Sequence, residues 1–131
     1  MREILFRGKT ILGKWIEGDL LQYLGCGKVY IAQYYKGAGG QEVIPETVGQ
    51  YTGLTDKNGK KIFEGDIIKC ISRFDAKDMV VIFETAEFHL VDCQRYKNYT
   101  ECCGYRQFGT METEVIGNIH DNPELLRGDT E

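Results

Sequence analysis

Five cysteines and two histidines are the residues in this chain best suited to nucleophilic or metal chemistry. His89, Cys93, Cys102 and Cys103 lie close together in the sequence, and His120 follows later. Zinc sites take tetrahedral sulfur and nitrogen ligands, usually from cysteine pairs about two to four residues apart. Adjacent cysteines cannot easily direct two thiolates at one metal, and the chain has no C-x-x-C sequence. We therefore expect no metal site and no cofactor, but the spacing leaves open a metal or redox role for Cys93, Cys102 and Cys103.

Catalysis by a thiolate or a carboxylate requires a second group, such as a base, close to the first, and the sequence does not identify such a pair. Any cysteine could meet either histidine in the folded chain, and no spacing favours one pair. Asp19, Glu64 and Asp66 are candidates for acid–base chemistry or cation binding. Each belongs to a Glu-Gly-Asp sequence, and glycine and aspartate are typical turn residues. The sequence thus predicts no catalytic residue and a protein that is not an enzyme.

Lys57, Lys60 and Lys61 gather around Asn58-Gly59, the strongest short signal for a hairpin turn. They are candidate contacts for nucleic acid or for a protein partner, or they simply solvate the hairpin tip. The sequence contains neither a P-loop nor a G-x-G-x-x-G before a helical pattern. The formal net charge of −4 also opposes strong phosphate binding, because phosphate contacts supply most of the affinity for nucleic acid.

Charge is distributed unevenly along the chain. Residues 1–61 hold nine Lys and Arg against six Asp and Glu, which gives +3, whereas residues 62–131 hold seven against fourteen, which gives −7. Such asymmetry suits a basic face for an anionic partner, or complementary ends that meet head to tail in an oligomer, although scattered solvated charge is an equal alternative. The leading hypothesis is a non-enzymatic protein that works through self-association and a protein partner.

The elements that must position these residues are predicted to be short strands. The chain has sixteen glycines, two prolines and many aromatic and β-branched residues, a composition typical of strands and tight turns. Residues 1–45 are expected to form a β-meander, with Lys36–Gln41 as a flexible loop before Pro45. Residues 46–131 should form a compact second domain that ends in a short helical turn at Pro123. The strands expected in the two domains are Glu3–Arg7, Lys14–Leu24, Lys28–Tyr35, Val48–Tyr51, Asp66–Arg73, Met79–Glu84, Phe88–Asp92 and Glu112–Ile119.

Met79–Glu84 is the most apolar of the predicted strands, and we expect it at the centre of a sheet. Residues 94–110 form a long polar and aromatic insertion, of a length that is usually functional or mobile. The residues predicted to be in the core are Ile4, Phe6, Trp15, Ile16, Ile31, Ile67, Val81, Phe83, Leu90, Val115 and Ile116.

With no secretion signal recognised and an odd number of cysteines, we expect reduced thiols in a cytoplasm and no association with membranes.

Three segments carry a resemblance to a known family: MREILFRG at the start, TVGQYTGLTDKNGKKIFEGDII in the middle and EVIGNIHDNPELL near the end. Together they resemble the YopX family of bacteriophage and prophage proteins. The resemblance implies that residues 46–131 form a small SH3-like β-barrel and that the chain assembles as a homo-oligomer. It also implies a phage or prophage gene acting in the cytoplasm of a bacterial host. It assigns no activity and no catalytic or binding residue.

Overall fold

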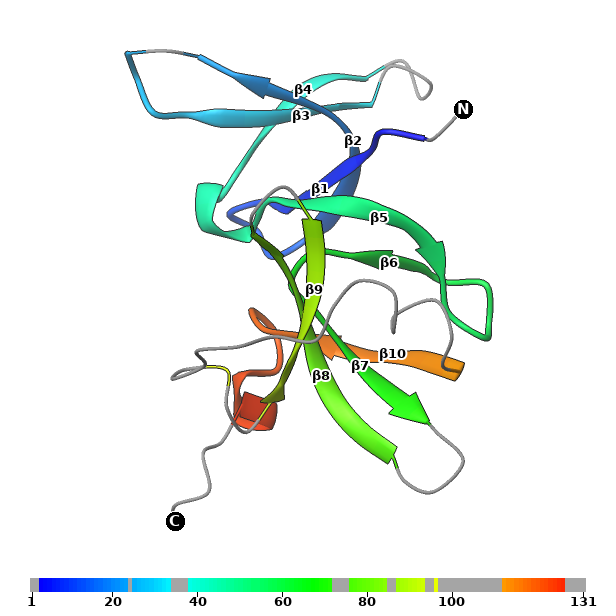
Figure 1. Cartoon of the computed structure of the whole chain (residues 1–131). Helices are drawn as coiled ribbons and strands as arrows, with labels where there is room; N and C mark the ends of the chain where they lie inside the picture. Colours follow the sequence, from blue (N-terminus) through cyan, green and yellow to red (C-terminus); the bar gives the residue numbers. More distant parts are fainter. Residues whose placement is uncertain are drawn as a thin grey trace. The chain divides into compact units, whose positions relative to one another are not determined.

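The computed structural model describes residues 3–23, 25–33, 38–71, 76–84, 87–93, 96 and 112–126. Within them the chain is mainly β, as predicted, with ten strands and two short 3-10 helices (Figure 1). It divides into two compact units, Met1–Gly53 and Leu54–Glu131. The elements are β1 (Phe6–Lys9), β2 (Trp15–Gln22), β3 (Val29–Gln33), β4 (Ala38–Val43), η2 (Pro45–Thr47), β5 (Gly49–Thr55), β6 (Lys61–Phe63), β7 (Asp66–Ile71), β8 (Ala76–Glu84), β9 (Glu87–Asp92), β10 (Glu112–Asn118) and η4 (Pro123–Leu126).

The first unit is an antiparallel sheet in the strand order β4-β3-β2-β1-β5, which contains the predicted meander. β2 serves two neighbours in turn: it pairs with β1 as far as Gly18 and with β3 from Asp19 onwards. A Cβ atom at Gly18 would collide with the carbonyl oxygen of Ala32, so only glycine fits at this change of partner. The buried core of the unit consists of Ile16, Val29, Ile31 and Val43.

The prediction of a flexible loop at Lys36–Gln41 is wrong for Ala38–Gln41. Ala38–Val43 is a strand, β4, that pairs in antiparallel register with β3. Pairing with β3 orders these glycines in spite of the conformational entropy that glycine loses on ordering. A side chain at Gly40 would be crowded, because its Cβ would lie 3.1 Å from Tyr30 Cβ. Lys36 and Gly37 lie outside the described residues.

β5 begins in the first unit and ends in the second, so the units divide at Gly53 within a strand. The sequence placed the change of domain earlier, at Pro45. The difference arises because Phe6 and Arg7 of β1 pair with Gln50 and Gly49 of β5, which adds the start of β5 to the N-terminal sheet.

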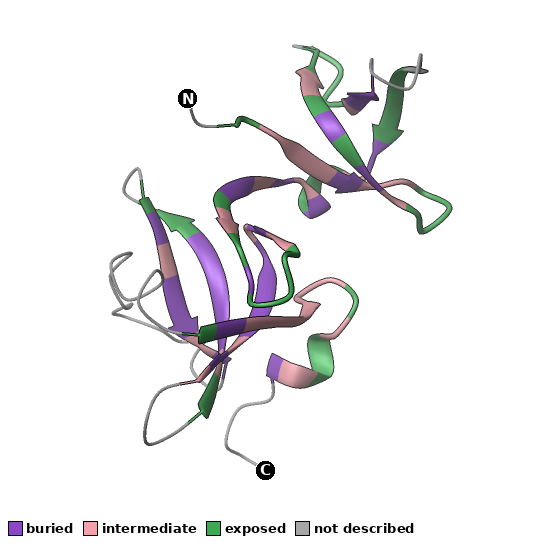
Figure 2. Cartoon of the chain, turned by 90° about the vertical axis from the view of Figure 1, so that its right-hand side faces the viewer, coloured by how far each residue is buried: buried purple, intermediate pink, exposed green. Residues whose placement is uncertain are grey.

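The second unit is built on an antiparallel sheet in the order β10-β7-β8-β9, and β8 lies inside it as predicted. Its strands are apolar on both faces, since side chains that alternate along each strand belong to two separate cores. Ile67 and Ile68 therefore both lie buried, although only Ile67 was among the predicted core residues. Figure 2 shows the long buried stretches along these strands. One core contains Ile62, Ile68, Cys70, Met79, Val81, Phe88 and Leu90, and the other contains Ile67, Val80, Ile82, Val91, Cys93 and Leu126.

Each face of this sheet has its own cover. Ile62 of β6 belongs to the first core, and Leu54 of β5 packs against it. Leu126 of η4 belongs to the second core, with Ile119 and Leu125 packed around it. The predicted helical turn at Pro123 is thus confirmed as η4, and it shields apolar side chains that the sheet alone would expose to water.

The closed SH3-like barrel is not confirmed. In the described part of the chain β10 and β9 are the two edges of the four-stranded sheet, and no pairing joins them. Two predicted core residues are also exposed. Ile4 precedes β1 and is 62% exposed, and Phe83 stands near the end of β8, beside Phe88, and is 43% exposed.

Gly18→Ala should lower the free energy of unfolding by about 1–3 kcal/mol, because the added methyl group has no room against the backbone of β3. Gly39→Ala is the matched control, since a Cβ there meets nothing within 4 Å. The control should be neutral or slightly stabilising. Urea denaturation of both variants measures the difference, and equal stabilities would contradict the close approach at Gly18.

Candidate interaction sites

The three predicted contact lysines lie on the β5–β6 hairpin, whose turn is organised by Asp56. Its Oδ1 accepts hydrogen bonds from the backbone N–H groups of Asn58 and Lys60, both at 2.9 Å. Its Oδ2 accepts one from Val115 N–H of β10, also at 2.9 Å. A single carboxylate thus shapes the hairpin and fastens it to the neighbouring sheet.

The hairpin predicted at Asn58-Gly59 is present, but its loop is not the two-residue type I′ turn that Asn-Gly favours. Gly59 N–H donates to the Asp56 carbonyl, and Asp56 N–H donates to the Lys60 carbonyl, which places Lys57 and Asn58 at the centre of the turn. Gly59 follows with φ +83°. This is a three-residue loop closed by glycine, a connection that is common in β-hairpins alongside the type I′ turn. The carboxylate of Asp56 favours it by binding two of its backbone N–H groups.

The three lysines of the hairpin do not form an isolated positive patch, because acidic side chains lie near them. Lys57 Nζ lies 3.8 Å from Glu114 Oε1, and Lys57 N–H donates to the Thr113 carbonyl. Lys60 is exposed and Lys61 is half-buried at the start of β6. Lys57, Lys60 and Lys61 therefore share one hairpin as predicted, but Asp56 and Glu114 lie among them and offset much of their charge.

Buried Asp56 is charged in the folded protein. Burial by itself raises the pKa of this carboxyl, but the hydrogen bonds from Val115, Lys60 and Asn58, together with the nearby Lys60 charge, bring the pKa below its usual value. Because the folded pKa is the lower one, the ionised carboxylate stabilises the fold above the unfolded pKa of about 3.9. This contribution is lost as the pH falls through the folded value.

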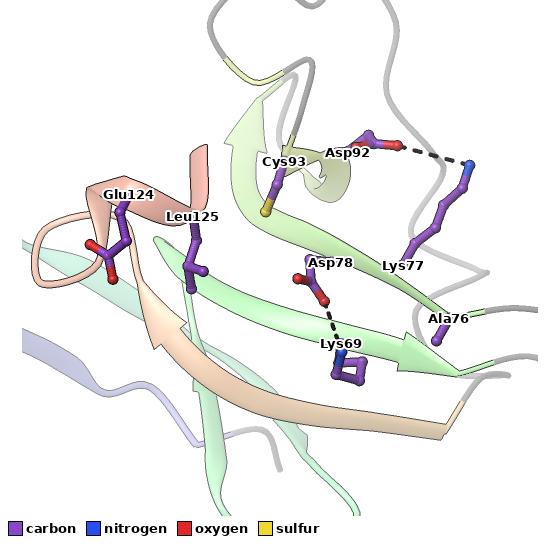
Figure 3. Close-up of a pocket in the computed structure, with 8 residues that line it drawn as sticks. All are labelled: Lys69, Ala76, Lys77, Asp78, Asp92, Cys93, Glu124 and Leu125. Carbon is purple, nitrogen blue, oxygen red and sulfur yellow. Dashed lines mark hydrogen bonds and ion pairs between the residues drawn. The ribbon is translucent and has the colours of Figure 1, made fainter. Parts of the chain in front are cut away.

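A second candidate site is a hollow of about 620 Å³ in the second unit, beside β8 and η4 (Figure 3). Two ion pairs lie in its wall: Lys69 Nζ is 3.4 Å from Asp78 Oδ1, and Lys77 Nζ is 3.9 Å from Asp92 Oδ2. Its remaining lining combines apolar and acidic groups: Ala76, Cys93, Glu124 and Leu125. The lining therefore carries three carboxylates against two ammonium groups, with a few apolar groups between them.

Cys93 in this hollow is unsuited to nucleophilic chemistry at neutral pH. Burial raises its pKa to about 12, and the nearby charges of Asp78 and Asp92 and the Cys70 thiol act in the same direction. A thiol with that pKa stays protonated at neutral pH, whereas attack and metal binding require the thiolate. His89 is not beside it; its Nε2 lies 3.1 Å from the carbonyl oxygen of Glu84.

The described residues contain no group of three or more His, Cys, Asp or Glu side chains placed to hold a metal ion. Cys102 and Cys103 lie outside the described residues. Asp66, one of the three candidate carboxylates, is buried and accepts a hydrogen bond from Phe63 N–H at 2.7 Å, so it is the turn former that the sequence favoured. Asp19 lies exposed on β2, and Glu64 lies half-buried just after β6. The absence of an enzyme activity and of a cofactor stays a prediction.

A third candidate site was not singled out by the sequence: the turn between β1 and β2. Ile11 and Leu12 stand at its tip and are 78% and 93% exposed. The turn itself is ordered by hydrogen bonds, because Thr10 N–H donates to the Lys14 carbonyl at 2.9 Å and Lys14 N–H donates to Thr10 Oγ1 at 3.1 Å. Gly13, at φ +88°, completes it. The signal that could have revealed this site is two adjacent aliphatic residues in a segment too short to bury them.

Strands β1 and β2, which lead into and out of this tip, share two contacts between a cation and the Trp15 ring. Arg7 Cζ lies 4.8 Å from the ring centre of Trp15, and Lys9 Nζ lies 5.8 Å from it. Lys9 and Lys14 border the exposed pair, so the tip presents apolar side chains between two positive charges. A solvent-exposed apolar pair on an ordered turn is a feature of interaction surfaces.

The fold defines a mainly β protein of two compact units. The family described as YopX protein matches residues 5–127, and the chain belongs to this family. Among solved structures the chain is similar to the crystal structure of protein EF1440 from Enterococcus faecalis, with a TM-score of 0.51 and 23% identity. That match covers 97% of this chain and 100% of the other, and at this identity it shows likeness of fold alone.

No curated protein matches the sequence. In the part of the chain that the structure describes, no helix combines the length and the hydropathy of a membrane-crossing segment.

Asp56→Ala should lower the free energy of unfolding by about 2–3 kcal/mol, since it removes an acceptor that is shared by three backbone donors. Lys57→Ala is the control: it removes only an exposed ion pair, worth below about 1 kcal/mol. The pH profile gives a second readout. Asp56→Asn should lose less stability than the unmodified protein between about pH 5 and pH 3, because it lacks the carboxylate with the lowered pKa. A large effect of Lys57→Ala or an unchanged acid profile would contradict this account.

Cys93 should resist alkylation in the folded protein, because its thiol is buried and protonated. Cys26, which is exposed, is the internal control. Iodoacetamide treatment at pH 8 followed by peptide mass spectrometry should show rapid labelling of Cys26 and labelling of Cys93 only after unfolding. Equal rates at the two cysteines would overturn the assignment of Cys93 as an unreactive core residue.

Proposed function

We propose that this protein is a non-enzymatic accessory protein of a phage or prophage, which acts by self-association and by binding a protein partner in the cytoplasm of the bacterial host. Membership of the YopX family supports the phage origin. Within this proposal the second unit is an SH3-like interaction module, whose sheet and covering hairpin give it a rigid surface.

The observation that carries the proposal is the exposed pair Ile11 and Leu12. Full burial of one aliphatic side chain contributes about 1.5–3 kcal/mol. Exposure of 78% and 93% leaves nearly all of this free energy available to a binding event. The hydrogen-bonded turn is already ordered, so binding costs little conformational entropy. Such a tip is suited to enter an apolar recess on another protein surface.

Charge gives the proposal its second support. The tip has Lys9 and Lys14 beside the apolar pair, and no acidic residue lies between them. The second unit, residues 54–131, contributes most of the acidic residues, with fifteen Asp and Glu against ten Lys and Arg, a net charge of −5. Opposite charges on surfaces of the same chain favour its association with another copy and align the contact.

Sedimentation equilibrium tests the proposal. The unmodified protein should associate reversibly, and Ile11→Ser with Leu12→Ser should shift it towards the monomer at every concentration. Ile4→Ser is the matched control, because Ile4 is an exposed isoleucine of the same unit that lies away from the tip. The unmodified protein as a monomer at both low and high salt would exclude self-association. Unchanged association of the double variant would exclude the tip as the surface through which the copies associate.

Binding of nucleic acid is the second candidate function, since Lys57, Lys60 and Lys61 lie together on one hairpin. The acidic neighbours Asp56 and Glu114 weaken the case for it. Filter binding with single- and double-stranded DNA and RNA tests it directly. Binding that falls with salt and is lost in Lys57→Gln, Lys60→Gln, Lys61→Gln would establish it, and no salt-sensitive binding at micromolar protein would rule it out.

A further inference from the structure

We propose that the tip formed by Ile11 and Leu12 of one molecule docks into the hollow beside β8 and η4 of a second molecule, so that copies join head to tail. The inference rests on the proposed self-association and adds the surface that receives the tip. It needs two different surfaces on each copy, and the described residues supply both.

Shape and polarity make the hollow a suitable receptor for the tip. Its volume of about 620 Å³ lies within the range of ligand pockets, about 300–1,000 Å³. Ala76 and Leu125 offer apolar contacts, and acidic groups border them. Figure 3 shows Leu125 on η4 and Cys93 just after β9. The tip has the matching order, two aliphatic side chains with a charge on either side.

The charges of the two surfaces are complementary. Lys69 and Lys77 in the hollow pair with Asp78 and Asp92, which leaves the carboxylate of Glu124 as the net charge of the lining. Glu124 accepts a hydrogen bond from the Asn122 side chain at 3.4 Å and is otherwise exposed. The tip brings +2, from Lys9 and Lys14, to a lining of −1. Two tips facing each other would instead bring four positive charges together.

The contact is heterologous, because the surfaces that meet are different. Each copy that accepts a tip still presents its own, so association continues until a ring closes or a filament grows. This property separates the proposal from a symmetric dimer and allows a test by mixing.

The test uses one variant with a defective tip and one with a defective hollow. Ile11→Ser with Leu12→Ser removes the apolar tip, and Ala76→Arg with Glu124→Lys fills the hollow and reverses its charge. Ala76 and Glu124 are both exposed, so the fold should be kept, and circular dichroism with thermal melting verifies it. Each variant alone should be monomeric, with its dissociation constant raised at least about tenfold. An equimolar mixture should form a heterodimer and nothing larger, since one intact tip and one intact hollow remain.

The outcomes distinguish this inference from the function on which it rests. If the unmodified protein and the hollow variant associate alike, the tip binds elsewhere and the inference fails while self-association stands. If the unmodified protein is monomeric, both fail. A mixture that remains monomeric although the unmodified protein associates also overturns the head-to-tail contact.

A disulfide trap gives a second readout that does not depend on weakened variants. Leu12→Cys in one molecule and Glu124→Cys in another, each with Cys26→Ser, are mixed and oxidised mildly. Peptide mass spectrometry should find the disulfide between positions 12 and 124 at least about tenfold more abundant than in a control that pairs Leu12→Cys with Tyr23→Cys. Equal yields with the control would contradict docking of the tip in the hollow.

Discussion

The second unit depends on one constraint: both faces of a small sheet must be kept from water. β7 and β8 carry apolar side chains on each face, and no four-stranded sheet can bury these alone. The chain therefore covers one face with Ile62 and Leu54 and the other with Leu126. Loss of either cover would expose several fully buried side chains, so the hairpin and the C-terminal turn are structural parts of this unit.

The same constraint explains the positions of the buried acids. Asp56 and Asp66 both lie at turns that feed the covering hairpin and β7, and both bind backbone N–H groups there. A short hairpin has few ladder hydrogen bonds of its own. The carboxylates of Asp56 and Asp66 supply further acceptors for its backbone N–H groups. Asp56 also accepts a hydrogen bond from Val115 N–H, which fixes the hairpin against β10.

The sequence predicted much of this fold because its strongest signals are local. The apolar run Met79–Phe83 marked β8, and Pro123 marked the final helical turn. The shape of the loop at Asp56 was not predictable, because it depends on hydrogen bonds that the propensity for Asn-Gly turns does not describe. β4 was missed for a similar reason: its glycines are typical of a loop, and only pairing with β3 makes them a strand.

The interaction sites were the least predictable part of the molecule. Lys57, Lys60 and Lys61 stood out because their charges are clustered, yet Glu114, distant in sequence, lies beside one of them. Ile11 and Leu12 were not predicted as a site: their adjacency in a short turn is a sequence signal, but the degree of their exposure is set by the fold. The hollow combines β7, β8, the end of β9 and η4, and its chemistry is visible only when these elements are assembled.

Association through an exposed apolar tip is the central claim, and sedimentation velocity over a wide range of protein concentrations tests it most directly. The account predicts a weight-average sedimentation coefficient that rises with concentration for the unmodified protein, and one that stays near the monomer value when Ile11 and Leu12 are both replaced by serine. A monomer value for the unmodified protein at every concentration would contradict it.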